Sequence, residues 1–245
     1  MKIVAVIPAR LESSRFPRKA LVDIHGLPMV VHVYKRCMLA SRIDFVAVAT
    51  DSEEIAKAVE LSGGNVIMTA SSHQTGTDRI AEAAESLDAD IIVDVQGDEA
   101  LVNPQYIDKV VEPLIANPSI DMAILINRFQ KKNSPSDIKV VINELNEVMY
   151  MSRSDIPSDS RSEGTQQYKA YHIVPYRKDF LLRYASWDPG RLERIEFNEF
   201  LRGLEKGYPI TAVEVESSAV SVDTEDDLAY VREKMLTDIF FKKYS

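Results

Sequence analysis

Four cationic side chains lie close together in the segment PARLESSRFPRKAL at residues 8–21, namely Arg10, Arg15, Arg18 and Lys19. Guanidinium groups bind phosphate oxygens in pairs, and a lysine adds a compact point charge. The segment has no glycine, which excludes the glycine-rich loops that hold phosphates with main-chain amides. Its side chains therefore predict a pocket for a triphosphate, with a solvated charged loop as the alternative interpretation.

Two aspartates follow apolar segments farther along the chain. Asp98 stands in QGDE after the run IIVDV, and Asp223 stands in SVDT near the C-terminus. A carboxylate that leaves a buried strand is suited to Mg²⁺, which takes oxygen ligands and is usually shared with substrate phosphates. Either residue could instead begin a turn, and Asp223 could simply precede the last helix. The two aspartates predict a magnesium site, and the capping role stays open.

Hydrophobic patterns place the cationic segment and Asp98 at strand ends. Apolar runs predict strands at residues 2–7, 45–51, 66–69 and 89–99, and helical spacing predicts helices at 29–39, 53–62 and 78–87. Strands that alternate with helices favour an α/β fold with a mostly parallel central sheet flanked by helices. In such folds ligands bind beyond the carboxyl ends of the strands. The predicted triphosphate and magnesium sites both lie at that edge.

The second half of the chain has a different pattern. It predicts a helix near 105–116, a strand at 122–129, and two strands within 138–152 joined at Asn143–Asn146. The polar stretch at 154–167 is interpreted as a mobile loop, or as one that a partner subunit or a ligand orders. Beyond it we expect a helix-rich segment at 171–202, strands at 209–215 and 218–223, and a last helix capped by Thr224. We interpret the chain as a single domain over residues 1–245. Residues 120–170 form a smaller β-rich insertion, which we expect to serve as a dimerisation arm.

Composition narrows the class of protein. The chain has 245 residues, 45% of them apolar, so it can bury a sizeable core, and its net charge of −9 argues against an extended nucleic-acid surface. The N-terminal apolar run is too short for a signal peptide or a membrane span, which favours a cytoplasmic protein without membrane insertion. Cys37, the only cysteine, lies in an apolar helical pattern and is expected to be a buried thiol. The four histidines are too scattered for a transition-metal site.

Several motifs occur together and in order: PARLESSRFPRKALVDIHGLPMVVHV, VATD, HQTGTDRIAEAA, VDVQGDE, IKVV, MSRSDIP and VDTEDDL. In this set the chain resembles the 3-deoxy-manno-octulosonate (Kdo) cytidylyltransferases over residues 3 to about 232. The resemblance implies a Rossmann-like nucleotide-diphospho-sugar transferase fold and a cytoplasmic homodimer. The implied reaction converts CTP and Kdo, with Mg²⁺, to CMP-Kdo and diphosphate for lipopolysaccharide biosynthesis.

The resemblance also implies roles for individual residues. Nucleotide binding is implied for Arg10, Ser13, Ser14, Arg15, Lys19, Gln74, Thr77, Arg79 and Gln96. Asp98 and Asp223 match the magnesium ligands, and with Arg10 and Lys19 they make up the implied catalytic set. On the sugar side we expect Arg153, His172, Tyr176, Arg177, Glu199 and Phe200. Arg153 is the first choice for the sugar carboxylate and Arg177 the second, because a carboxylate favours a bidentate guanidinium.

The chain departs from the family pattern at informative positions. Arg18 stands where the family commonly has Gly, Ala170 where it has His, and Phe200 where it has Gln. The last two positions belong to the family's sugar side, so the accepted sugar is expected to change. Our leading hypothesis is a modified Kdo such as the 8-amino form. Plain Kdo is the alternative within the class, and a non-catalytic CTP-binding homologue is the alternative outside it.

Overall fold

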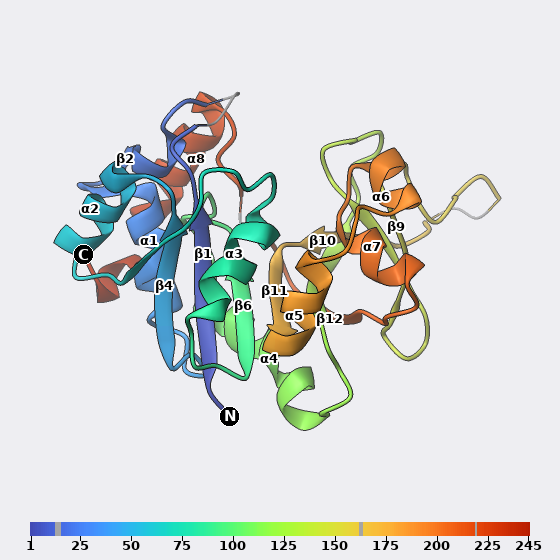
Figure 1. The fold of residues 1–245 in the computed structure, drawn as a ribbon. Helices are drawn as coiled ribbons and strands as arrows, with labels where there is room; N and C mark the ends of the chain where they lie inside the picture. The colour runs from blue at the N-terminus through green and yellow to red at the C-terminus, as the bar shows by residue number, and fades with distance from the viewer. Residues whose placement is uncertain (13–15, 162–163, 219) are drawn as a thin grey trace. The chain divides into compact units, whose positions relative to one another are not determined.

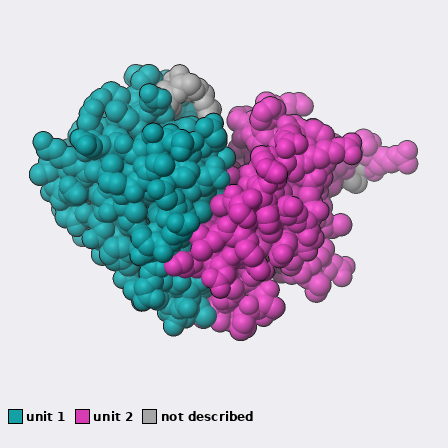
Figure 2. Space-filling model, viewed as in Figure 1, with its two compact units in different colours: residues 1–108, 219–245 teal, residues 109–218 magenta. Residues whose placement is uncertain are grey.

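The computed structural model describes residues 1–12, 16–161, 164–218 and 220–245. The chain divides into two compact units, shown in Figure 2. Unit 1 comprises Met1–Asp108 and Ala219–Ser245, and unit 2 comprises Lys109–Ser218. The insertion expected at residues 120–170 falls inside unit 2, and its role in dimerisation stays a prediction.

Unit 1 contains parallel strands that lie side by side in the order β6, β1, β4, β5 (Figure 1). They are β1 (Ile3–Ala9), β4 (Phe45–Thr50), β5 (Val66–Met68) and β6 (Ile91–Val95). The side chains of β1, β4 and β6 are almost all buried, as expected for strands covered on both faces. Because all four strands run the same way, their carboxyl ends share one edge. This confirms the α/β fold and brings the residues that follow β1, β4 and β6 to that edge.

Helices flank this sheet, and their boundaries follow the sequence signals. They are α1 (Met29–Cys37), α2 (Glu53–Leu61), α3 (Gly76–Glu85) and α8 (Glu225–Met235), while α4 (Pro104–Ala116) contains the boundary between the units. Ser52 caps α2, and Thr75 and Thr224 form reciprocal capping boxes with Asp78 and Asp227. The short elements of unit 1 are η1 (Lys19–Leu21), β2 (Asp23–Ile24), β3 (Leu27–Pro28) and η2 (Phe241–Lys243).

Unit 2 is built on a mixed sheet in the order β12, β7, β10, β8, β9. Its strands are β7 (Ala123–Phe129), β8 (Lys139–Ile142), β9 (Val148–Ser152), β10 (Gln167–Tyr171) and β12 (Thr211–Val215). Between β10 and β12 the chain also forms β11 (Ile173–Arg177), α5 (Lys178–Ala185), α6 (Arg191–Glu196) and α7 (Phe200–Glu205). The turn predicted between β8 and β9 is confirmed. There Asn146 has a positive φ of 59°, and Asn143 Oδ1 accepts the main-chain N–H of Glu147 at 2.9 Å.

Some local predictions are wrong for physical reasons. The described residues of 218–223 form no strand, because their main-chain bonding to Asp98 is a single contact from Val222 and not a ladder. Conversely, β10 lies mostly between the predicted loop at 154–167 and the helix-rich segment at 171–202, and β11 lies inside the latter. Both strands were missed because their pairing depends on distant strands. Cys37 is buried as expected. Among the helices of the described ranges, none is long and apolar enough to cross a bilayer.

Candidate active site

The loops after β1 and β6 meet at the carboxyl edge of the unit 1 sheet. Arg10 directly follows β1 and is exposed, and the turn Gln96–Glu99 directly follows β6. Gly97 makes this close approach possible, because a Cβ at that position would lie 2.9 Å from the carbonyl oxygen of Pro8. The glycine of QGDE therefore allows the acidic turn to pack against the end of the first strand.

Lys19 joins the two predicted magnesium ligands. Its ammonium nitrogen lies 2.6 Å from Asp98 Oδ2 and 3.1 Å from Asp223 Oδ1, and it also donates to the carbonyl of Val222 at 3.2 Å. Burial alone would lower the pKa of Lys19, but the carboxylates of Asp98 and Asp223 outweigh it and raise the pKa above its ordinary value. Lys19 is therefore a firmly charged ammonium, held between two aspartates that are 125 residues apart in sequence (223 − 98).

The geometry separates the two interpretations of Asp223. The cap of α8 is made by Thr224 and Asp227, whose side chains bond reciprocally to the first turn of the helix. The carboxylate of Asp223 instead contacts Lys19, which lies in η1. A main-chain bond of 3.0 Å from Val222 N to Asp98 O holds the two acid-bearing segments together. Asp223 therefore belongs to the site at the strand ends and is not the capping residue.

The residues at this point fit a hard divalent cation. Two carboxylates converge on one ammonium nitrogen, so the same place favours positive charge and offers oxygen ligands. Within the described ranges no three His, Cys, Asp or Glu side chains gather as a complete metal site. A pair of aspartates suits Mg²⁺, which commonly takes its remaining ligands from substrate phosphates and water.

Arg18 is directed away from this arrangement. Its backbone is left-handed, with a φ of 59°, which accounts for the glycine commonly found at this position in the family it resembles. Its guanidinium pairs with both carboxylate oxygens of Glu54 on α2, one of them at 3.3 Å, and its side chain is 58% exposed. The Glu54 hydrogen bond is also the main cause of the raised pKa of Arg18. Arg18 thus ties the cationic segment to α2.

The other predicted nucleotide residues lie around the same sheet edge. Arg79 is buried, donates to Thr69 Oγ1 at 2.6 Å and pairs with Asp51 at 3.4 Å, so it ties α3 to the segments that follow β4 and β5. Gln96 donates to both carboxylate oxygens of Asp94 at 2.9 Å. Thr77 is buried and Gln74 is exposed. The predicted contacts of Ser13, Ser14 and Arg15 lie outside the described residues.

The two arginines expected at the sugar carboxylate lie in unit 2 and differ in how they are bonded. Arg153 donates from Nε, Nη1 and Nη2 to the carbonyls of Glu196, Pro135 and Phe197 at 2.8, 2.8 and 3.0 Å. Each of its terminal nitrogens carries a second N–H, so the fork between them can still meet a carboxylate. Arg177 directs Nη2 to the carbonyls of Leu114, in the last turn of α4, and of Asn117, which directly follows that helix. The choice of Arg153 before Arg177 for the sugar carboxylate stays a prediction.

The remaining residues predicted for the sugar side also lie in unit 2. The rings of His172 and Phe200 stack with centroids 5.4 Å apart and an interplanar angle of 25°, and Phe200 is only 4% exposed. Glu199 precedes Phe200 and is half-buried, with its carbonyl accepting the hydroxyl of Tyr184. Tyr176 is fully buried. An aromatic pair therefore occupies the position where the family resemblance leads one to expect an amide.

Comparisons with known proteins show the family of this chain. A family model described as cytidylyltransferase matches residues 4–213. The chain belongs to the cytidylyltransferase family. Two curated relatives, the 3-deoxy-manno-octulosonate cytidylyltransferases of Geobacter metallireducens and Pelobacter propionicus, are each 45% identical to it. The first alignment covers 96% of this chain and 98% of the relative, and the second covers 96% and 97%.

Solved structures resemble this cytidylyltransferase over nearly its whole length. A CMP:2-keto-3-deoxy-manno-octonic acid synthetase in complex with CTP superimposes with a TM-score of 0.94 at 36% identity, covering 97% of this chain and 99% of that one. A cytidylyltransferase from Leptospira borgpetersenii, at 18% identity and a TM-score of 0.67, shares the fold. The chain is thus a nucleotidyltransferase.

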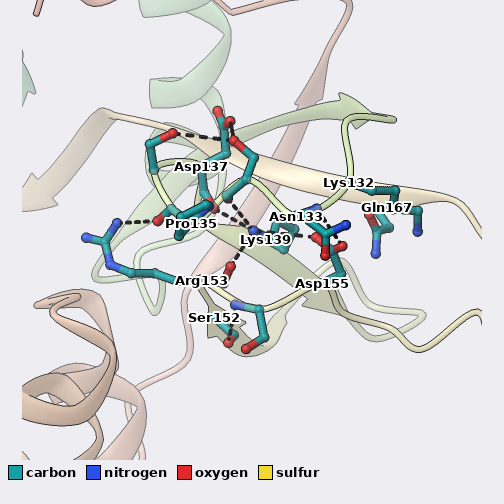
Figure 3. Close-up of polar contacts among 12 residues, drawn as sticks. Lys132, Asn133, Pro135, Asp137, Lys139, Ser152, Arg153, Asp155 and Gln167 are labelled. Carbon is teal, nitrogen blue, oxygen red and sulfur yellow. Dashed lines mark hydrogen bonds and ion pairs between the residues drawn. The ribbon is translucent and has the colours of Figure 1, made fainter.

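Sequence reasoning missed residues of this cytidylyltransferase that hold others in place. Asp94 lies inside the buried strand β6 and orients Gln96. Lys139 is the first residue of β8 and is fully buried, and its ammonium meets several main-chain carbonyls (Figure 3). A charged residue within an apolar run, as in IIVDV and IKVVI, was the available signal. A charged side chain that is buried in a strand needs hydrogen-bonding or oppositely charged groups around it, and the sequence alone does not show which groups these are.

Proposed function

We propose that this cytidylyltransferase activates a Kdo-type acidic sugar, converting CTP and the sugar to a CMP-sugar and diphosphate for lipopolysaccharide biosynthesis. The supporting observation is the convergence of Lys19, Asp98 and Asp223 at the carboxyl edge of the sheet. Curated relatives at 45% identity carry the name of this activity, and the similar synthetase structure contains CTP. The proposal includes a cytoplasmic homodimer, as the family resemblance implies.

On the nucleotide side the chain's task is to align and neutralise the triphosphate. Arg10 is exposed beside the end of β1, where its guanidinium can bind phosphate oxygens, and the ammonium of Lys19 lies within the same segment. Arg79 and Gln96 are already oriented by Thr69 and Asp94, so they can present fixed groups to the base and ribose. Such preorganised charges stabilise the charge that develops on the leaving diphosphate.

We assign Asp98 and Asp223 to Mg²⁺, which when bound would act as a Lewis acid towards phosphate oxygens. In the transfer, the anomeric hydroxyl oxygen of the sugar forms a bond to the α-phosphorus. The bond from that phosphorus to the bridging oxygen of diphosphate breaks, and the hydroxyl proton passes to solvent. No covalent enzyme intermediate is needed, so the catalytic residues position and neutralise.

The sugar side favours a modified Kdo as the preferred substrate. Phe200 is buried against His172, so an apolar ring stands where the family has a glutamine amide. Ala170, where the family has histidine, is also buried and lies within β10. A sugar hydroxyl left without its hydrogen-bond partner in a buried site costs about 1–3 kcal/mol. These changes predict an altered preference among Kdo-type sugars, for which the 8-amino form stays our leading hypothesis and plain Kdo the alternative.

The test is diphosphate release by the purified enzyme with CTP and Mg²⁺, using Kdo, the 8-amino sugar or N-acetylneuraminic acid. We expect turnover with the Kdo-type sugars only, and a higher kcat/KM for the 8-amino form. Equal or better kcat/KM with plain Kdo would remove the modified-sugar hypothesis and leave the activity intact. Calorimetric binding of CTP without turnover of either Kdo-type sugar would instead support a non-catalytic CTP-binding homologue.

A further inference from the structure

Lys139 places a fully buried ammonium group in unit 2. It lies at the start of β8, with 0% of its surface exposed. Nζ donates to three main-chain carbonyls, those of Ser134 at 2.7 Å, Asp137 at 3.0 Å and Arg153 at 2.5 Å (Figure 3). An ammonium has three donors, so its hydrogen-bonding capacity is matched by these contacts. The carbonyls come from two separate segments, which meet at this one nitrogen.

Further polar contacts hold the same two segments together. Asp155 Oδ2 accepts the main-chain N–H of Asn133 at 2.9 Å, and Asp155 Oδ1 lies 3.7 Å from Lys139 Nζ. Next to these segments, Lys132 pairs with Asp159 at 2.7 Å, and both side chains are partly exposed. A buried charge costs several kcal/mol unless it is bonded and paired, and Lys139 meets both conditions. The ammonium is therefore the internal anchor for segments 133–137 and 153–155.

The anchor continues through Arg153 to the segment that carries predicted sugar residues. Arg153 donates to the carbonyls of Glu196 and Phe197, which end α6, and its main-chain N–H donates to Glu196 Oε2 at 2.9 Å. A cation is favourable at a helix C-terminus, because the last carbonyls there have no partners within the helix. Phe197 is left-handed, with a φ of 48°, so the chain turns sharply here before Glu199 and Phe200. A displaced Arg153 would release this turn.

We propose that Lys139 is a positioning residue for the sugar side of the enzyme. It fixes the main chain of Arg153, and Arg153 fixes the turn that leads to Glu199 and Phe200. The inference rests on the proposed function, which places Arg153, Glu199 and Phe200 at the sugar. An apolar side chain could fill the position of Lys139 in β8 but could not bind the three carbonyls. Replacement should therefore loosen these segments while leaving the nucleotide residues of unit 1 unchanged.

The kinetic test compares Lys139→Met with two controls in unit 2. Lys169→Met removes the lysine opposite Lys139 in the β10–β8 register, whose ammonium meets the side chain of Asp137 at 3.0 Å and lies 5.4 Å from the centre of the Phe129 ring. Val140→Ala destabilises the core of the same strand. We expect Lys139→Met to raise the sugar KM about 10- to 100-fold, with the CTP KM unchanged within about twofold. Both controls should keep the sugar KM near that of the wild type.

Hydrogen exchange supplies a readout that needs no substrate. The amides of segments 133–137 and 153–155 should exchange at least about tenfold faster in Lys139→Met than in Val140→Ala, compared at matched global stability. An unchanged sugar KM in folded Lys139→Met would overturn the proposal. So would parallel rises of the sugar and CTP KM values that Val140→Ala reproduces.

Two further outcomes keep the inference separate from the proposed function. If Lys139→Met does not fold, Lys139→Arg replaces it, because arginine keeps the charge but presents a planar fork to the three carbonyls. A wild-type sugar KM in that variant would overturn the proposal. If the wild-type enzyme turns over no Kdo-type sugar, the proposed function fails. Unchanged exchange in segments 133–137 and 153–155 of either variant then refutes the anchor independently.

Discussion

At the scale of single residues, two neighbouring cations in one segment bind different partners. Lys19 turns inward to two carboxylates, whereas Arg18 turns outward to Glu54. Charge and proximity in sequence do not distinguish them, whereas the structure gives Arg18 a left-handed backbone and a partner on α2. Positive charge in the segment is therefore not all directed at the triphosphate.

This difference predicts the result of a matched pair of variants. Lys19→Met should lower kcat/KM for CTP by about 100-fold or more, because it removes a fixed charge beside the proposed site of nucleotidyl transfer. Arg18→Gly should leave kcat/KM within about twofold, because its guanidinium is used by Glu54 and glycine adopts a positive φ without steric cost. Steady-state diphosphate release at saturating sugar measures both. Equal losses in the two variants would contradict the assignment.

At the scale of elements, one carboxylate joins β9 to α6. Glu196 ends α6 and accepts Ser152 Oγ at 2.7 Å, the main-chain N–H of Arg153 at 2.9 Å and Tyr150 Oη at 3.3 Å. Burial alone would raise the pKa of Glu196, but these hydrogen bonds outweigh it and hold the pKa below its ordinary value of 4.5. The ionised form is therefore the one that the folded protein favours.

The sign of this shift sets the expected pH dependence. A carboxylate with a lowered folded pKa stabilises the protein above its unfolded pKa, and this contribution is lost as the pH falls through the folded pKa. Glu196→Gln should therefore reduce the free energy of unfolding by about 1–2 kcal/mol at neutral pH. The difference from wild type should shrink as the pH falls below 4.5, measured by denaturant titration. A difference that stays constant from neutral pH to well below that value would contradict the role of the charge.

At the scale of the whole molecule, unit 2 exposes apolar side chains on the hairpin of β8 and β9. Leu145 is 75% exposed and Met149 is 63% exposed. Apolar side chains gathered on one surface element are typical of sites covered by a partner. Both residues fall within the segment 120–170 that the sequence marked as a dimerisation arm, and we therefore use them to test the expected homodimer.

Sedimentation velocity provides that test. The wild-type protein should sediment as a dimer at micromolar concentration, and the double variant Leu145→Glu, Met149→Glu should shift towards monomer because buried charges oppose association. Leu61→Glu serves as the control, because the side chain of Leu61 is similarly exposed, at 80%, but lies on α2 of unit 1. A monomeric wild-type protein would refute the homodimer, and an unchanged dimer in the double variant would move the interface elsewhere.

The sequence by itself determined the parts that depend on local periodicity. Alternating strands and helices predicted the parallel sheet, and residues at strand ends, such as Arg10 and Asp98, could be assigned to its carboxyl edge because parallel strands all end on the same side. The sequence also predicted the helix cap at Thr224, because a capping residue and its helix are neighbours in the chain.

Only the tertiary structure decided which partner each of these side chains has. Asp223 could be read as a cap or as a ligand until its contact with Lys19, 204 residues away (223 − 19), was visible. The stack of Phe200 on His172 and the three carbonyls around Lys139 likewise join segments that no local pattern connects. The sequence gives the chemistry of each side chain, but the role of that side chain depends on which groups folding brings within hydrogen-bonding distance.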